Sequence, residues 1–135
     1  MPTRRLLLIA ATLSAFLYSS PGRADENASA NRIFVDAVKS WNEAASLTGD
    51  GLPTLERRAA LLEHVTQRLA QIVQDHPGAN LAVKLVSGEQ VGSLSLASAE
   101  EALKDTRAAS ARVQCNAKPT RACVFEEALA TARSI

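Results

Sequence analysis

The sequence predicts an all-α protein, a small array of about five helices that follows a signal peptide. Three observations support this class. Apolar residues recur every three or four positions along most of the chain. Clusters of Gly, Pro, Asn and Asp separate these stretches and mark turns. The composition leans on alanine, leucine, glutamate, arginine and glutamine, which are good helix formers. We expect stacked helix hairpins, arranged as a solenoid-like array or as a bundle.

The N-terminus has the parts of a secretory signal peptide. Arg4 and Arg5 supply a positive start, and residues 6–18 form an apolar run. This run has 13 residues, whereas a helix that spans a membrane needs roughly 20. Residues 19–21 are expected to break the apolar helix. An uncleaved membrane anchor and a buried core helix are the alternatives.

Small residues at Gly22 and Ala24 fit a signal peptidase and predict cleavage before Asp25. The predicted organisation is therefore a signal peptide over residues 1–24 and one helical domain over residues 25–135. We expect a periplasmic or secreted protein. The paired arginines also fit the twin-arginine export route, so the route stays open.

The charge of the exported part argues against a nucleic-acid or membrane partner. The whole chain carries 15 basic and 14 acidic residues. Cleavage removes Arg4, Arg5 and Arg23, which leaves 12 basic and 14 acidic residues and a net charge of −2. Nucleic acid and anionic lipid both favour a basic surface. Stacked bases or sugars also need several aromatic faces. The mature chain has three aromatic residues: Phe34, Trp41 and Phe125.

The first predicted helix runs from about Asn31 to Leu47, and residues 48–51 end it with two glycines and an aspartate. Its apolar face comprises Phe34, Val38, Trp41 and Ala45, with Ile33 and Ala37 beside them.

The second predicted helix begins at Pro53 with Thr54 as N-cap, and residues 75–78 stop it. Its apolar stripe comprises Leu55, Ala59, Leu62, Leu69, Ile72 and Val73.

A short third helix is predicted from Asn80, as N-cap, to Ser87. It contains Leu81, Val83 and Leu85. Gly88 is placed to take the left-handed conformation at its end. We expect residues 88–95 to form a packed loop; a short extended piece at residues 91–94 is the alternative.

The fourth predicted helix runs from near Ser95 to about Gln114, with a thin stripe made of Leu96, Ala99, Leu103, Thr106, Ser110 and Val113. The fifth begins after Pro119 with Thr120 as N-cap and continues to the end of the chain. Its apolar face comprises Val124, Ala128, Leu129 and Ala132. Either Ile135 packs into a groove or longer chain follows it.

Cys115 and Cys123 are the chain's two cysteines and flank the connection between the last two helices. In an oxidising compartment such a pair predicts a structural disulfide. Closing so short a loop contributes on the order of 2–3 kcal/mol by restricting the unfolded chain. A reactive thiol at Cys123, at the start of a helix, and two buried free thiols are the alternatives.

No constellation of residues predicts catalysis, a cofactor or a metal. His64 and His76 lie twelve residues apart and lack the spacing of metal ligands, so an exposed position and a helix end are expected. Adjacent glutamates, at 100–101 and 126–127, point about 100° apart on a helix and do not form a facing acid–base pair. We expect a protein that is not an enzyme.

Trp41 is the candidate partner contact. Its spacing with Phe34 and Val38 predicts a core position. Tryptophan is also enriched at interaction hot spots, so a partner contact is the alternative.

Two stretches of the chain resemble the exported bacterial tetratricopeptide-type helical repeat proteins. Residues 69–82 (LAQIVQDHPGANLA) resemble a repeat helix, its proline stop and the opening of the next helix. Residues 127–133 (EALATAR) resemble an alanine-rich repeat helix. The resemblance implies stacked helix hairpins that hold other proteins, with no catalytic residues.

The sequence therefore predicts an exported protein–protein interaction module with an unidentified protein partner. We expect its binding surface to be a groove between the second and fourth helices. The alternative is a helical bundle that binds a small apolar ligand in a sizeable apolar cavity.

Overall fold

A computed structural model describes residues 20–134 and confirms the all-α class. Its helices are α1 (Ser20–Ser46), α2 (Leu52–Asp75), α3 (Asn80–Val86), α4 (Leu96–Ala117) and α5 (Arg121–Arg133). The predicted signal sequence up to residue 19, and the prediction for Ile135, lie outside the described residues. None of the described helices has the length and hydropathy to cross a membrane.

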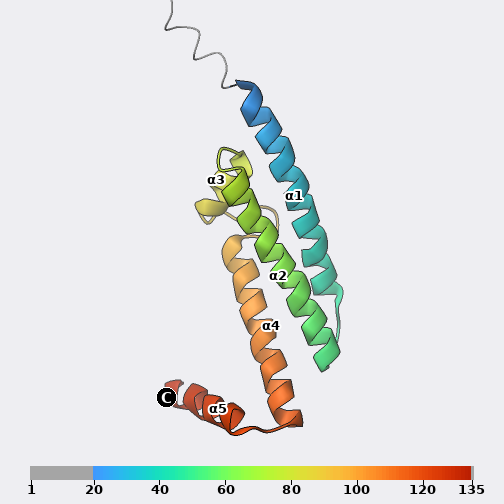
Figure 1. Cartoon of the computed structure of the whole chain (residues 1–135), viewed down its shortest axis with the longest axis vertical. Helices are drawn as coiled ribbons and strands as arrows, with labels where there is room; N and C mark the ends of the chain where they lie inside the picture. The colour runs from blue at the N-terminus through green and yellow to red at the C-terminus, as the bar shows by residue number, and fades with distance from the viewer. Residues whose placement is uncertain (1–19, 135) are drawn as a thin grey trace, which may run out of the picture.

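Helices α1, α2 and α4 form a single layer with α2 in the middle. Helix α2 packs against both α1 and α4. Figure 1 shows that α1 and α4 run in the same direction and α2 in the opposite one. The short α3 and the turn that follows it lie at one end of the layer, and α5 projects from the far end of α4 (Figure 1).

Helix α1 begins at Ser20, so the prediction that it starts at Asn31 was wrong. Residues 20 and 21 were expected to break a helix, but both belong to α1. Proline is tolerated in the first helical turn because its missing N–H would have no partner there. The early part of α1 also has a packing role, because Ala30 is fully buried. The predicted cut before Asp25 falls within this helix.

Small residues form the centre of the α1 face that packs on α2. Ala30, Ala37 and Ala44 are buried at intervals of seven residues. The predicted large residues lie beside them and are half-buried: Ile33, Phe34, Val38 and Trp41. Ala45 was expected on this face but is exposed. Alanine side chains allow two helix backbones to approach closely, so the seam is centred on them.

The facing side of α2 repeats with the same period, and its predicted stripe is largely confirmed. Its buried residues are Leu55, Leu62, Val65, Leu69 and Ile72. The start of α2 differs from the prediction, because Gly51 is the N-cap and Thr54 lies inside the helix. The Gly51 carbonyl accepts the Leu55 N–H at 3.0 Å. Pro53 occupies the first turn, which places the cap before the proline.

The start of α3 is capped by another helix. Asn80 was predicted as N-cap, but its backbone N–H instead donates to Oδ1 of Asn27 in α1 at 2.8 Å. Ala79 takes the N-cap position. Val83, which the sequence placed in this helix, is 59% exposed.

The segment from α3 to α4 forms the packed loop that was predicted. Gly88 has φ +77°, the left-handed conformation expected at the end of α3. Val91 and Leu94 then exchange two backbone hydrogen bonds, of 2.9 and 3.1 Å, in an isolated bridge. Gly92, with φ +62°, permits this tight turn. The turn buries Leu94 completely.

Helix α4 starts as predicted and ends later. Ser95 caps it, and Ser98 returns the hydrogen bond to form a capping box. The helix continues three residues beyond Gln114, so Cys115 lies inside its last turn. The predicted stripe is buried in its first half, at Ala99, Leu103 and Thr106.

Helix α5 begins after its predicted cap, and Thr120 Oγ1 accepts the Cys123 N–H at 3.3 Å. Its predicted apolar face does not pack on the layer, however. Val124 is 60% exposed and Leu129 is 39% exposed, and Ala128 and Ala132 are also exposed. The periodicity identified an apolar face correctly but could not show that nothing in the described chain covers it.

Candidate functional site

An open groove lies across the three-helix layer, near the end of α1 and the start of α2, and is the candidate functional site. It has a volume of about 310 Å³ and takes residues from α1, α2 and α4. We call it the Trp41 groove. It is lined by Trp41, Ala44, Ala45, Arg58, Leu62, Ala102, Asp105 and Thr106.

The groove exists because the residues on either side of α2 are small. Ala44 and Ala45 come from α1, and Ala102 comes from α4. A short side chain at each of these positions leaves space above α2 that leucine would fill. The floor contains Leu62, which is 4% exposed and belongs to the core.

Trp41 belongs partly to the core, and the rest of its side chain lines the groove. Its side chain packs against both clusters of buried core residues, as the helical spacing predicted. It is only half-buried, and its remaining surface lines the groove. A large aromatic face anchored on one side and open on the other suits a binding contact.

Polar groups around the groove are mostly satisfied within the chain. The Thr106 hydroxyl donates to the Ala102 carbonyl at 2.8 Å, and the Arg58 guanidinium donates to the Leu47 carbonyl. Asp105 is exposed and forms no ion pair with any described residue. The groove therefore presents an apolar floor with one unpaired carboxylate at its α4 side.

The groove lies between α2 and α4, where a binding surface was expected, and α1 forms an additional wall. Ala45, Leu62 and Thr106 were placed on apolar helix faces, but no lining residue other than Trp41 was predicted as a site residue. Alanines carry no chemical signal of a site, and Arg58 and Asp105 lie 47 positions apart in the sequence.

A second polar cluster joins α1 to α2. Asp36 Oδ2 lies 3.1 Å from His64 Nε2 and 2.8 Å from Arg68 Nε. Arg68 also donates to Gln71 Oε1 at 2.9 Å. His64 was expected to be a plain exposed residue and is instead half-buried in this ion-pair cluster.

The cluster shifts the titration of its carboxylate. The hydrogen bond with His64 lowers the pKa of Asp36 below its ordinary value, and the Arg68 charge acts in the same direction. Desolvation opposes these effects in part. A carboxylate held between two basic groups is a structural ion-pair arrangement that ties the two helices together.

The cluster does not gather the groups that would indicate catalysis. His76 ends α2, where its N–H donates to the Ile72 carbonyl at 3.0 Å, and it lies apart from the cluster. Among residues 20–134, no three His, Cys, Asp or Glu side chains come together as metal ligands would.

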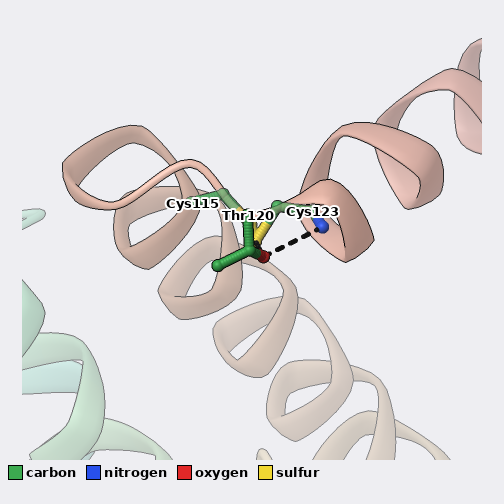
Figure 2. Close-up of a disulfide and its surroundings, with 3 residues drawn as sticks. All are labelled: Cys115, Thr120 and Cys123. Atoms are coloured by element: carbon green, nitrogen blue, oxygen red, sulfur yellow. Dashed lines mark hydrogen bonds between the residues drawn. A yellow bond between two sulfur atoms is a disulfide. The ribbon is translucent and has the colours of Figure 1, made fainter.

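The predicted disulfide is present and lies between α4 and α5 (Figure 2). The Cα atoms of Cys115 and Cys123 are 5.6 Å apart, within the ordinary range for a disulfide. Thr120 Oγ1 lies 3.1 Å from Cys123 Sγ, beside the hydrogen bond that caps α5. The bond therefore fixes the first turn of α5 against the last turn of α4.

A second open groove, of about 550 Å³, lies between α4 and α5. The residues that α5 contributes to it are Cys123, Glu126, Ala130, Thr131 and Ser134. Three of these five residues are polar. The large apolar residues Val124, Phe125 and Leu129 do not line this groove.

The chain matches no family model, no curated protein and no solved structure.

Proposed function

We propose that this protein is a protein–protein interaction module whose Trp41 groove binds an amphipathic helix of a partner. The observation that supports it is an open apolar groove across three helices with a half-buried tryptophan in its wall. Such a groove can seat apolar side chains that recur at every third or fourth position of a partner helix.

The layer of α1, α2 and α4 is suited to accept one more helix. Helix α2 is flanked by α1 and α4, and its groove side is open to solvent. A helix laid in the groove would complete a four-helix arrangement. Helix axes that pack together lie about 8–10 Å apart, and small residues at the contact favour the close end of that range. Ala44, Ala45 and Ala102 supply those residues.

Groove shape favours a partner helix over a small apolar ligand. A ligand site usually buries most of its ligand in a cleft of roughly 300–1,000 Å³. The Trp41 groove is at the bottom of that range and opens along the protein surface. It can hold a few side chains that project from a larger partner.

We also propose that the protein works outside the cytoplasm, in the periplasm or as a secreted protein. The charged start and apolar run of residues 1–18 support export. The disulfide supports an oxidising compartment, because disulfides are rare in the reducing cytosol.

The test is site-specific photo-crosslinking in producing cells. A photoreactive phenylalanine replaces Ala45, which is exposed and lines the groove, or Val83, an exposed control on α3. We expect products from position 45 that are absent from position 83, with the partner contact mapped by mass spectrometry to an amphipathic helix. Equal products from both positions, or none from position 45, would contradict the proposal.

The mapped partner segment then permits a direct affinity measurement. Trp41 is the chain's only tryptophan, so its fluorescence reports on the groove. We expect a synthetic peptide of the mapped segment to change this fluorescence on binding. Measured calorimetrically, Trp41→Ala should weaken peptide binding about 10–30-fold, the usual loss for an aromatic anchor. An unchanged affinity would remove Trp41 from the site.

A further inference from the structure

The disulfide determines which side of α5 faces the rest of the molecule. Cys123 is bonded to Cys115 of α4, so the Cys123 side of α5 is turned towards α4 (Figure 2). Successive residues of a helix are about 100° apart around its axis. Phe125 follows Cys123 by two residues, about 200° around the helix axis, and therefore lies on nearly the opposite side of α5. In this structure the disulfide holds the Cys123 side of α5 next to α4, so Phe125 lies on the side away from α4.

The side of α5 turned outward is apolar. Val124 is 60% exposed, Phe125 is 67% exposed and Leu129 is 39% exposed. Together they form an exposed stripe, which we call the α5 stripe. The side that faces α4 instead carries Glu126, Ala130 and Ser134. Glu126, Ala130 and Ser134 are exposed as well, so the described chain covers neither side of α5 beyond Cys123.

We propose that the α5 stripe of one copy of this chain occupies the Trp41 groove of a second copy, so that two chains exchange α5 helices. This inference rests on the proposed function of the groove and names its partner. The chain cannot satisfy both surfaces by itself, because the disulfide turns the stripe away from its own α4. Reciprocal exchange covers both surfaces and closes a two-fold dimer.

The two surfaces are complementary in shape. The groove is open and can accept a helix that carries a narrow apolar stripe. Helix α5 provides one, in which Phe125 and Leu129 are separated by one turn. The exposed aromatic ring of Phe125 can pack against the open face of Trp41.

One charge of the groove can be matched by the stripe: Arg58 in the lining donates to the Leu47 carbonyl, and Asp105 is left for a partner cation. Arg121 and Arg133 lie one turn before Phe125 and one turn after Leu129, so they mark the two ends of the stripe. Neither arginine forms an ion pair with a described residue. The groove offers the unpaired Asp105 at its α4 side. Docking would bring this carboxylate near one of the two arginines.

The test is the oligomeric state of the purified, oxidised chain, measured by analytical ultracentrifugation over a concentration series. We expect a dimer. Val124→Asp should raise the dimer dissociation constant at least about 10-fold, because it places a charge in the stripe. Val83→Asp is the matched control, since Val83 is 59% exposed and Val124 is 60% exposed. Ala45→Glu, at an exposed position in the groove, should weaken the dimer as Val124→Asp does.

Mixing the two variants separates exchange from other dimers. The Val124→Asp chain keeps an intact groove, and the Ala45→Glu chain keeps an intact stripe. An equal mixture should therefore regain a dimer held by one contact, although neither variant dimerises alone. Far-UV circular dichroism confirms that each variant is folded.

Three results would overturn the exchange. The first is a monomeric wild-type chain, and the second is a dimer that neither variant weakens. The third is a dimer that Val124→Asp weakens and Ala45→Glu does not, which would mean that the α5 stripes of two chains pair with each other. A monomer whose Ala45 position still crosslinks to a different protein would leave the proposed function intact. A monomer without crosslinks would remove both.

Discussion

Two polar side chains of α1, Asn27 and Asp36, reach across to other helices and hold α1 in place. Asn27 accepts the Asn80 N–H at the start of α3. Asp36 pairs with His64 and Arg68 of α2. Buried seams between helices do not by themselves determine how far one helix slides along another. These directional contacts add that restriction on both sides of Ala30.

Removal of the Asn27 side chain should expose the start of α3. We expect Asn27→Ala to lower the free energy of unfolding by about 1 kcal/mol, the usual cost of a lost helix cap. Asn80→Ala is the control, because the Asn80 side chain makes no hydrogen bond with a described residue and only its backbone N–H is used. Urea unfolding measures both. A larger loss for Asn80→Ala would show that Asn80 is the cap, as the sequence alone predicted.

The Asp36 cluster should contribute stability that depends on pH. Its folded-state pKa is lowered, so the stabilisation is complete above the unfolded-state value of about 3.9 and is lost as the pH falls through the lower folded value. Asp36→Asn should therefore lower the urea midpoint at neutral pH, with a gap to wild type that narrows from about pH 5 to about pH 2.

Asp50→Asn provides the control for this measurement. Asp50 is exposed between α1 and α2 and forms no ion pair with a described residue. Its substitution should leave the urea midpoint close to wild type across the same pH range. A constant gap for Asp36→Asn at every pH would mean that the cluster acts through shape and not through charge.

At the scale of helices, the seam between α1 and α2 depends on residues of different size at matching intervals. Ala30, Ala37 and Ala44 repeat every seven positions on α1, and Leu55, Leu62 and Leu69 repeat every seven on α2. A seven-residue period keeps the same face of each helix against its neighbour. Small residues facing large ones fill the seam without pushing the helices apart.

Enlarging one of these alanines should disrupt the seam. Ala37 is 0% exposed, so Ala37→Leu should lower the free energy of unfolding by about 1–3 kcal/mol through overpacking. Ala60→Leu adds the same atoms at an exposed position of α2 and should change it by less than about 0.5 kcal/mol. Urea unfolding measures both variants. If Ala37→Leu and Ala60→Leu were equally stable, the space around Ala37 between α1 and α2 would have to be large enough for a leucine side chain.

Helix ends followed the sequence where the capping group is local. Thr120 caps α5 and Gly88 ends α3, as predicted, and Ser95 caps α4 at its predicted start. The predicted caps Thr54 and Asn80 were wrong for different reasons. Pro53 lies in the first turn of α2, so the N-cap is Gly51, three residues before Thr54. The cap of α3 comes from Asn27, which is 53 positions away in the sequence. A local pattern carries no information on a cap that comes from another helix.

At the scale of the whole molecule, the stable core lies in α1 to α4 and the disulfide lies outside it. Among the residues whose burial is described, the buried ones fall between Ala30 and Thr106. Cys115 and Cys123 join the end of α4 to α5, where none of the residues of described burial is buried. The disulfide therefore acts on the position of α5, although its short loop suggested a contribution to overall stability.

Loss of both cysteines should separate α5 from the rest. In the monomer, we expect the double substitution Cys115→Ser and Cys123→Ser to change the free energy of unfolding in the main thermal transition by less than about 0.5 kcal/mol. The change is small because α5 adds little to the core. The helical signal in circular dichroism should fall by the share of the 13 residues of α5. Reductant should have the same effect on the wild type and none on the variant. A loss of about 2–3 kcal/mol in the main transition would place α5 in the core.

The sequence by itself determined the helical class, the approximate positions of α2 to α5 and the end of α1, the local caps and the disulfide pair. These features depend on neighbouring residues, on the 3.6-residue period and on a chain with only two cysteines. Tertiary structure alone decided that Asn27 caps α3, that Asp36 meets His64, and that Trp41 borders a groove. It also decided that the apolar face of α5 points outward. The physical reason is that periodicity identifies which face of a helix is apolar, whereas only the packed chain shows what that face meets.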